Sequence, residues 1–419
     1  MATSISSTGK WIWCVVIIVL YVISNFENTS FSTILTEISE DLCDNGCSSK
    51  QMGAIKILHY VMKIVTGPLF GLLGDRYNRK YLTICGLCIW SGFNLLMTFM
   101  PDYWSFVVTN GLSSAGMTIS NNLGPPMLAD LFSGNVRVWI LGVYSLGTPL
   151  GLGLGMVIPS ALLEVTGDWR NSLRLTPGIT LFCAIIIFFF LSDPPRGGIK
   201  RDEEEKTPTA SGWSDFKYIM SKTPFVLQMI AVTSTTFTQS TLNYWLPHLY
   251  RQAIREYNID HGDGTSPIRE LDVGYIIGVL TIVAGIVGII TGSTLSSYFH
   301  SKWQDSRIDP LLIGVSTLVS LPLICGSSFV PKETITAFVL LGFYLIFAHV
   351  FVSIGLNFTM SVIAPSKRSF ALSLQKTAIN AIGKASSSAT TGLIIDAINP
   401  SNSEVGSIFI YSRKFSNIK

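Results

Sequence analysis

The chain has 419 residues, of which 48% are hydrophobic and 13% are charged, and its mean hydropathy is +0.46. Soluble domains carry about 25% charged residues, so this composition excludes an ordinary soluble domain and indicates an integral membrane protein. The net charge is only +3, and no Lys/Arg tract is interleaved with aromatic residues, which excludes a nucleic-acid partner.

The first half of the chain holds six apolar segments long enough to cross a bilayer, for which about 20 apolar residues are needed. They run approximately over Trp11–Leu35, Met52–Leu73, Tyr81–Phe99, Tyr103–Leu128, Val138–Leu163 and Leu173–Leu191. The first segment contains Glu27 and has no clear small-residue cleavage site. We therefore predict a first membrane span there rather than a signal peptide.

A charge-rich stretch with the run RDEEEK separates these six segments from five more. The later segments are Pro224–Leu249, Val273–Phe299, Pro310–Phe329, Ile335–Ile363 and Phe370–Ile395. Two-lobed transporters are built from repeats, and the expected arrangement has six helices on each side of a linker. We predict an N-terminal six-helix lobe over residues 1–192, a linker over 193–222 and a C-terminal lobe with five clear helices over 223–419.

After Asp396 only a few consecutive residues are apolar. The fold class expected is therefore an all-α integral membrane bundle of about eleven transmembrane helices, with the last of the usual twelve missing or truncated.

Basic residues concentrate in one set of alternate loops, which the positive-inside rule places in the cytoplasm together with the N-terminus. These residues are Arg76, Arg79, Lys80, Arg137, Arg196, Lys200, Arg201, Lys206, Lys302, Arg307, Lys367 and Arg368. The linker over 193–222 is therefore expected to be cytoplasmic. Cys43 and Cys47 lie in an acidic loop of the other set. Whether they form a disulfide depends on the compartment that this loop faces, and their spacing leaves the question open.

The loop between the second and third spans reads GLLGDRYNRK. Gly71 permits close approach of helices, and Asp75 can accept hydrogen bonds from a neighbouring helix N-terminus. The loop resembles the signature of the major facilitator superfamily, which implies a two-lobed helix bundle and a cytoplasmic charge relay that helps to hold the outward-facing state. The gating motif expected from this resemblance comprises Gly71, Asp75, Arg76, Arg79, Lys80 and, at the start of the fifth span, Arg137.

Several longer phrases resemble the Spinster family of that superfamily, over most of the chain. They are GDRYNRKYL from Gly74, ADLF from Ala129, GDWRNSLRLTPG from Gly167, DPPRG from Asp193 and APSKRSFALSLQ from Ala364. The resemblance implies a secondary transporter of lysophospholipids or sphingoid lipids such as sphingosine-1-phosphate. It also implies alternating access, proton coupling in some members, and a lysosomal, late endosomal or plasma membrane location. We expect a monomer that needs no cofactor or metal.

At several coupling positions the chain departs from the family pattern. The family's Asp and Arg of the first span correspond to Glu27 and Asn28, so the acid is kept and the base is lost. In the fourth span an Arg and a Glu correspond to Asn110 and Met117, and in the tenth a Glu is replaced near Leu345. Coupling to protons therefore stays open.

Ionisable residues inside the spans are functional hypotheses, because each costs at least about 2.5 kcal/mol at mid-bilayer. At 1.5 Å per residue, Lys63 lies about 18 Å above the Asp75 end of its helix and Glu27 about 24 Å above the Trp11 end of its own. We predict that Lys63 pairs with Glu27 in the empty protein and attracts an anionic head group in the loaded one. A static ion pair that holds the two helices in register is the alternative.

Asn28, Asn110, His59 and His349 complete the predicted substrate or coupling site. His59 lies one turn from Lys63 on the same face, although Lys56 and His59 could instead reach the outer interface by snorkelling. His349 titrates near neutral pH, although a lone His is more often a packing residue.

Two further functions stay open beside a lipid transporter. They are a non-transporting or regulatory truncated form, and a transporter of another small organic anion. An enzyme is not expected, because the sequence contains no HExxH, GxSxG or comparable constellation.

Overall fold

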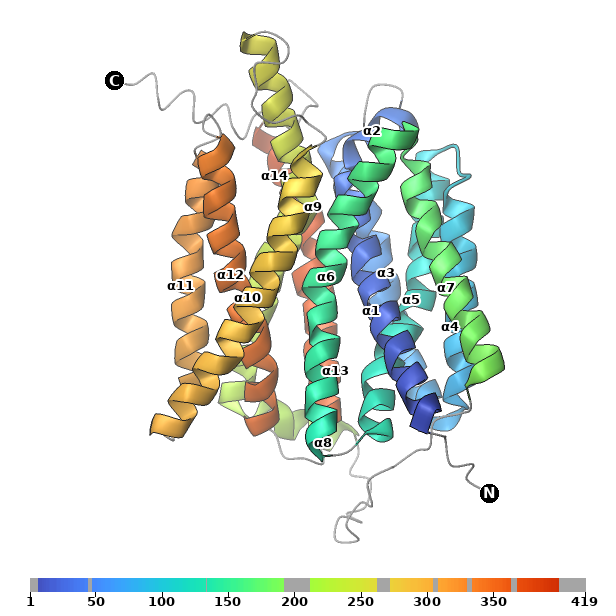
Figure 1. Cartoon of the computed structure of the whole chain (residues 1–419), viewed down its shortest axis with the longest axis vertical. Helices are drawn as coiled ribbons and strands as arrows, with labels where there is room; N and C mark the ends of the chain where they lie inside the picture. Colours follow the sequence, from blue (N-terminus) through green and yellow to red (C-terminus); the bar gives the residue numbers. More distant parts are fainter. Residues whose placement is uncertain are drawn as a thin grey trace.

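The computed structural model describes residues 7–43, 47–132, 134–191, 212–261, 272–303, 308–329, 334–362 and 368–398. This part of the chain is almost entirely helical (Figure 1). The N-terminal half consists of α1 (Ser7–Thr33), α2 (Leu35–Leu42), α3 (Ser49–Arg76), α4 (Arg79–Met97), α5 (Tyr103–Leu131), α6 (Gly134–Thr166) and α7 (Arg170–Phe190). The C-terminal half begins with α8 (Gly212–Met220), α9 (Thr223–His261), α10 (Asp272–Trp303), α11 (Ile308–Phe329) and α12 (Thr334–Val362). It ends with α13 (Arg368–Ala378), the π-helical η3 (Ile379–Ala385) and α14 (Ser386–Ile398), which follow one another without a break.

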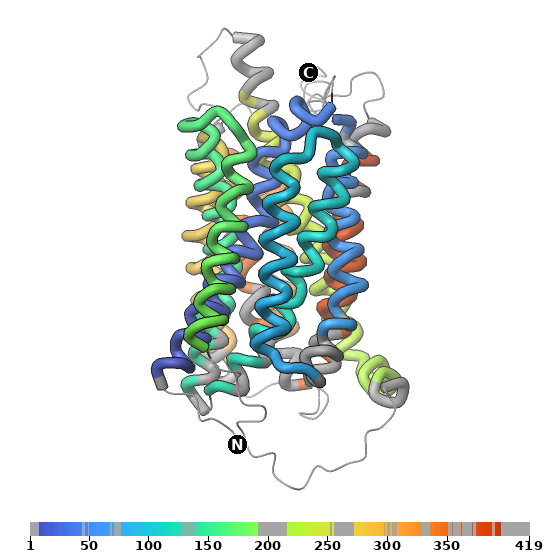
Figure 2. The backbone as a smooth tube through the Cα atoms, turned by 90° about the vertical axis from the view of Figure 1, so that its right-hand side faces the viewer, coloured from blue at the N-terminus to red at the C-terminus, as the bar shows by residue number. Residues whose placement is uncertain are grey.

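The predicted spans coincide with the long helices of the described residues. Within this part of the chain, six helices are long and apolar enough to cross a membrane: Thr8–Thr33, Arg79–Met97, Gly142–Thr166, Arg170–Phe190, Asp272–Ser296 and Ile308–Ser327. The remaining predicted spans also form long helices, and the total of eleven stays a prediction. The short helices α2 and α8 were not predicted. They lie at opposite ends of the bundle, with α8 at the end of the N-terminus and α2 at the other (Figures 1 and 2). We call the latter the α2 end.

Two helices have polar N-cap residues. Such residues accept hydrogen bonds from the first backbone N–H groups of a helix, which have no partner inside the helix. The side chain of Asn78 accepts from the backbone N–H groups of Lys80 and Tyr81 and caps α4. The carboxylate of Asp102 accepts from the N–H of Ser105 at 2.9 Å and caps α5. This hydrogen bond holds the pKa of Asp102 below its ordinary value.

The two halves meet along two helix pairs, α6 with α10, and α3 with η3 and α14, while α1 also packs against α9. The contact of α6 with α10 is close because Gly153 faces Gly278. A Cβ at Gly153 would lie 2.5 Å from the carbonyl oxygen of Gly278 and would also strike Ile282. On its other side α6 packs on α1, where Thr29 donates to the carbonyl of Leu152 at 3.0 Å. Small residues thus bring three helices together near the centre of the molecule.

Candidate functional site

Glu27, in the C-terminal half of α1, is held by two side chains of α4. Its Oε2 accepts from Nε1 of Trp90 at 2.6 Å and from Nδ2 of Asn94 at 2.7 Å. Trp90 and Asn94 are four residues apart and therefore share one face of α4. Glu27 is 1% exposed, and its Oε1 accepts no hydrogen bond from the residues that the structure describes. One carboxylate oxygen is thus fixed, and the other is left for a proton, a water or a ligand.

The predicted ion pair between Glu27 and Lys63 is not formed in this structure. Lys56 is buried, and its Nζ lies 4.2 Å from the ring centroid of Phe31, one turn along α1 from Glu27. Lys56 is thus a lysine of α3 that reaches α1 within one turn of Glu27. The Nζ of Lys63 lies 5.4 Å from the ring centroid of Tyr60. Counted by helix rise, the height of Glu27 lies between the heights of Lys56 and Lys63. Residue counting therefore could not predict which lysine lies nearer to Glu27.

His59 and Asn110 join α3 to α5 inside the N-terminal half. Both are fully buried, and Nδ1 of His59 lies 3.2 Å from Oδ1 of Asn110. The amide of Asn110 donates to the carbonyl of Ile55 at 3.1 Å, and the hydroxyl of Ser114 donates to the carbonyl of His59 at 2.8 Å. Because the Asn110 amide is used in this way, Nδ1 of His59 is the donor in their shared hydrogen bond. The burial of Lys56 and His59 excludes the snorkelling alternative.

Asn28 and His349 bond to their own helices. The Asn28 amide donates to the carbonyl of Ser24 at 2.9 Å, and its Oδ1 is buried without a partner among the described residues. Nδ1 of His349 donates to the carbonyl of Leu345 at 2.8 Å. His349 also packs against Gly288 of α10, so its contacts belong to the junction of α10 with α12 and not to the group around Glu27.

The predicted gating motif is described only in part. The surroundings of Gly71, Asp75, Arg76 and Arg137 are outside what the structure describes. Arg79 is the first residue of α4, and Lys80 follows it. The Nζ of Lys80 donates to the carbonyl of Phe188 at 2.9 Å, in the last turn of α7. A cation at the C-terminal end of a helix is favourable, because the free carbonyl groups there carry partial negative charge. Lys80 thus joins the start of α4 to the end of α7.

Sequence reasoning missed one basic residue, Lys384, which lies in η3. The helix η3 packs against α3, the helix that carries Lys63. The signal was present, since Lys376 and Lys384 both fall inside the predicted span Phe370–Ile395 and the rule for intramembrane charges applies to them equally.

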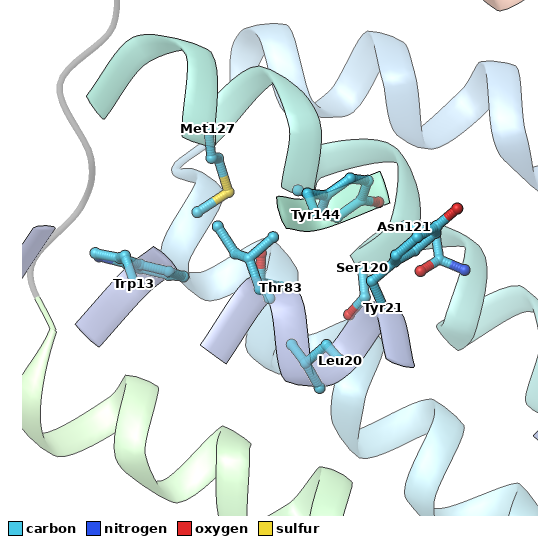
Figure 3. A pocket seen from close by; sticks show the side chains of 10 residues that line it. Trp13, Leu20, Tyr21, Thr83, Ser120, Asn121, Met127 and Tyr144 are labelled. Carbon is cyan, nitrogen blue, oxygen red and sulfur yellow. The ribbon is translucent and has the colours of Figure 1, made fainter. Parts of the chain in front are cut away.

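A small cavity lies between α1, α4, α5 and α6, on the N-terminal side of Glu27 along α1 (Figure 3). Its volume is about 10 Å³, and the residues that line it include Tyr21, Thr83, Ser120, Asn121 and Tyr144. Such a volume holds at most one water molecule. The cavity is therefore too small for an organic substrate.

At the α2 end, polar contacts tie the two halves together. Nη1 of Arg251 on α9 lies 2.6 Å from Oε1 of Glu37 on α2. Nδ1 of His248 lies 2.7 Å from the hydroxyl of Thr36. The hydroxyl of Tyr244 donates to the carbonyl of Met52 at the start of α3. These contacts hold the end of α9 against α2 and α3.

A disulfide between Cys43 and Cys47 links the end of α2 to the segment before α3. The question that the sequence left open is thus answered in the structure. Thr36 and Glu37, which contact α9, therefore lie on a helix whose C-terminal end is covalently constrained.

Comparison with known proteins shows which family has this sequence pattern and fold. The family model of the Major Facilitator Superfamily matches residues 17–388. Protein spinster homolog 1 of Xenopus tropicalis is 30% identical over 392 residues, which are 92% of this chain and 73% of that protein. Protein spinster of Drosophila melanogaster is 28% identical over 408 residues, which are 95% of this chain and 65% of that protein.

Solved structures show the same fold. A bacterial homologue of the human lysosomal transporter Spinster, in an inward-facing and unoccupied conformation, superposes with a TM-score of 0.76 at 16% identity, covering 94% of this chain and 84% of its own. A D-xylose-proton symporter gives a TM-score of 0.71 at 15% identity, covering 96% of this chain and 94% of its own. The molecule is thus a multi-pass membrane transporter with the two-lobed helical bundle that the sequence predicted. The chain belongs to the Spinster family of the Major Facilitator Superfamily.

Proposed function

We propose that this transporter moves a single-chain lipid with an anionic head group, a lysophospholipid or a phosphorylated sphingoid base, across a membrane by alternating access. The observation that carries the proposal is the presence of three ionisable residues inside the bundle: Glu27 of α1 and Lys56 of α3, which are buried, and Lys63 of α3. Charged side chains are costly at this depth and persist where they meet a partner or a substrate. Lys63 is half-buried, in the middle of the helix that packs against η3 and α14.

Lys63 is proposed to bind the head group, and Glu27 to carry a proton or to hold the empty site. Asn28 and Asn110, with His59 and His349, are secondary members of the proposed site. Asn110 and His59 act by positioning α3 against α5. The free Oε1 of Glu27 supports proton uptake at this residue.

The organisation of the chain in the membrane is part of the proposal. Residues 1–192 form the first lobe, 193–222 the cytoplasmic linker and 223–419 the second lobe. The N-terminus faces the cytoplasm, as the distribution of Lys and Arg indicates. The protein acts as a monomer in a lysosomal, late endosomal or plasma membrane. The solved bacterial protein is a homologue of a human lysosomal transporter, which supports the lysosomal membrane among these.

Uptake into vesicles that contain the purified protein tests the proposal. Labelled lysophospholipids and sphingosine-1-phosphate are offered to wild type, Glu27→Gln and Lys63→Ala, with and without a pH gradient. Lys302→Ala, at an exposed position of α10, is the matched control. We expect uptake by wild type and by the control, and loss in both site variants. Dependence of wild-type uptake on the pH gradient would assign proton coupling to the transporter.

No lipid uptake by well-folded wild type would overturn the proposal. Uptake of another organic anion in its place would favour the second transport hypothesis. Failure to move any solute would favour a non-transporting form.

A further inference from the structure

Lys63 and Lys384 occupy corresponding depths in two neighbouring helices that belong to different halves. Lys63 is 14 residues after Ser49, the first residue of α3, which is about 21 Å of helix. Lys384 is 14 residues before Ile398, the last residue of α14, which is again about 21 Å. The N-terminus of α3 and the C-terminus of α14 both lie at the α2 end. Along their length, α3 packs against η3 and α14. The two lysines therefore lie near the middle of the bundle, on either side of the boundary between the halves.

The charges around these two lysines are unbalanced. Lys63 and Lys384 lie on packed helices and both carry positive charge, and Lys56 adds a third positive charge on α3. Neither Lys63 nor Lys384 forms an ion pair with an acidic residue that the structure describes. Like charges interact strongly where water is scarce, so such a pair costs stability unless an anion lies between its members.

The backbone around Lys384 departs from a regular α-helix. Residues Ile379–Ala385 form a π-helix, a feature that is frequent at functional sites. The hydroxyl of Ser386 donates to the carbonyl of Ile382, and that of Ser387 donates to the carbonyl of Lys384 at 2.9 Å. A Cβ at Gly383 would lie 3.2 Å from the carbonyl oxygen of Thr233, so this side of η3 is packed against α9. The wide turn is thus supported on both sides of the lysine.

We infer that Lys384 is a second anion-binding residue of the central site and that, with Lys63, it selects substrates whose head group carries two negative charges. The inference rests on the proposed transport function and adds the class of head group. Lys56, Lys63 and Lys384 carry three positive charges against the one carboxylate of Glu27, and Lys376, about two helical turns before Lys384, adds a fourth. A phosphate monoester carries about −1.5 to −2 at neutral pH and offers three acceptor oxygens. A zwitterionic phosphodiester such as phosphocholine has no net charge and matches this site less well.

The ligand also lies between the halves in this arrangement. One lysine belongs to α3 and the other to η3, so a bound dianion is held by both at once. Neutralising the repulsion brings the halves closer around the substrate, which gives the charge of the head group a direct role in closing the site.

Binding and uptake of two labelled lipids with the same acyl chain test the inference. The probes are lysophosphatidic acid, a phosphate monoester, and lysophosphatidylcholine, a zwitterionic phosphodiester. They are offered to the full-length protein as wild type, Lys384→Gln, Lys384→Arg and the control Lys302→Gln. A hydrogen bond between charged groups contributes about 1.5–3 kcal/mol, so Lys384→Gln is expected to raise the Kd of the monoester about tenfold or more. The Kd of the phosphodiester is expected to change less than about twofold, and Lys384→Arg is expected to retain wild-type preference.

Thermal melting of the empty protein separates a binding role from a structural one. Because Lys384→Gln removes a repulsion, we expect its melting temperature to equal or exceed that of wild type. A lower melting temperature, or equal binding of the monoester by wild type and Lys384→Gln, would overturn the inference while leaving lipid transport intact. Absence of binding and uptake in wild type would instead refute the proposed function. Sphingosine-1-phosphate in a parallel arm distinguishes a sphingoid from a glycerol source of the same head group.

Discussion

Removing the charge of Glu37 is expected to open the α2 end. Its carboxylate is 2.6 Å from Nη1 of Arg251, whose side chain is 5% exposed, while that of Glu37 is 25% exposed. Breaking a buried ion pair costs roughly 3–5 kcal/mol, because one charge is left without a partner. Glu37 is partly exposed, and the side-chain carbonyl oxygen of Gln in Glu37→Gln can still accept a hydrogen bond from Arg251. Both effects reduce the expected cost to about 2 kcal/mol.

A cost of about 2 kcal/mol changes a two-state equilibrium about 30-fold. The contact joins α2 to α9, so the conformation in which the two halves separate at the α2 end loses nothing from the substitution. A separated state populated to about 1% in wild type would rise to about a quarter of the molecules in Glu37→Gln. The change is large enough to be seen directly as a distance.

Spin labels on each half measure this distance. One is placed at Trp104→Cys, an exposed position at the start of α5, and the other on native Cys325, which is exposed on α11. Cys85→Ser and Cys88→Ser remove the other exposed thiols. We expect Glu37→Gln to add a population at longer distance.

The matched control is Asp41→Asn. It breaks an ion pair of the same length, with Arg170 at 2.6 Å, that lies wholly within the N-terminal half. This variant should leave the distribution of distances unchanged. If Glu37→Gln also leaves it unchanged, the Arg251 contact does not hold the halves together and the reasoning is refuted.

Three further changes test other parts of the fold. Gly153→Ala places a methyl group against the Gly278 backbone and should lower stability by about 1–3 kcal/mol, whereas Gly142→Ala, with open space around it, should have little effect in the same thermal melt. Trp90→Phe removes a hydrogen bond to the Glu27 carboxylate at a cost of about 1.5–3 kcal/mol, and uptake assays should show slower transport; an unchanged rate would contradict a role for this contact. Cys43→Ser opens a ring of short sequence separation, for which chain entropy predicts a loss of about 2 kcal/mol. If Cys43→Ser speeds hydrogen exchange relative to wild type in α2 but not in α5, the effect is local.

The positions of the spans could be predicted because hydrophobicity is a property of each segment by itself. The expected span Tyr103–Leu128 starts where α5 starts, at Tyr103, since Asp102 is a recognisable helix cap. Helix α2 escaped prediction because its eight residues LTEISEDL are too short and too polar to cross a bilayer. Its helical form depends on packing at the α2 end.

The candidate site was predicted only as far as single residues allow. Glu27 stood out because a carboxylate in an apolar run is unusual, but its partners Trp90 and Asn94 carry no charge and gave no signal. Lys56 lies near Glu27 because its ammonium group packs on the ring of Phe31. Residue counting along the helices cannot predict this contact. Contacts between helices distant in sequence decide these details.

The π-helical turn in η3 has a consequence for everything that follows it in the chain. A π turn holds one residue more than an α turn, and each residue of an α-helix turns the chain by about 100°. Residues Ser386–Ile398 therefore present to α3 a face about 100° away from the one that an uninterrupted α-helix would present. Shortening Ile379–Ala385 by one residue would restore a regular helix, yet it would also rotate α14 out of register with α3. The boundary between the two halves of this transporter thus depends on the number of residues in a single turn.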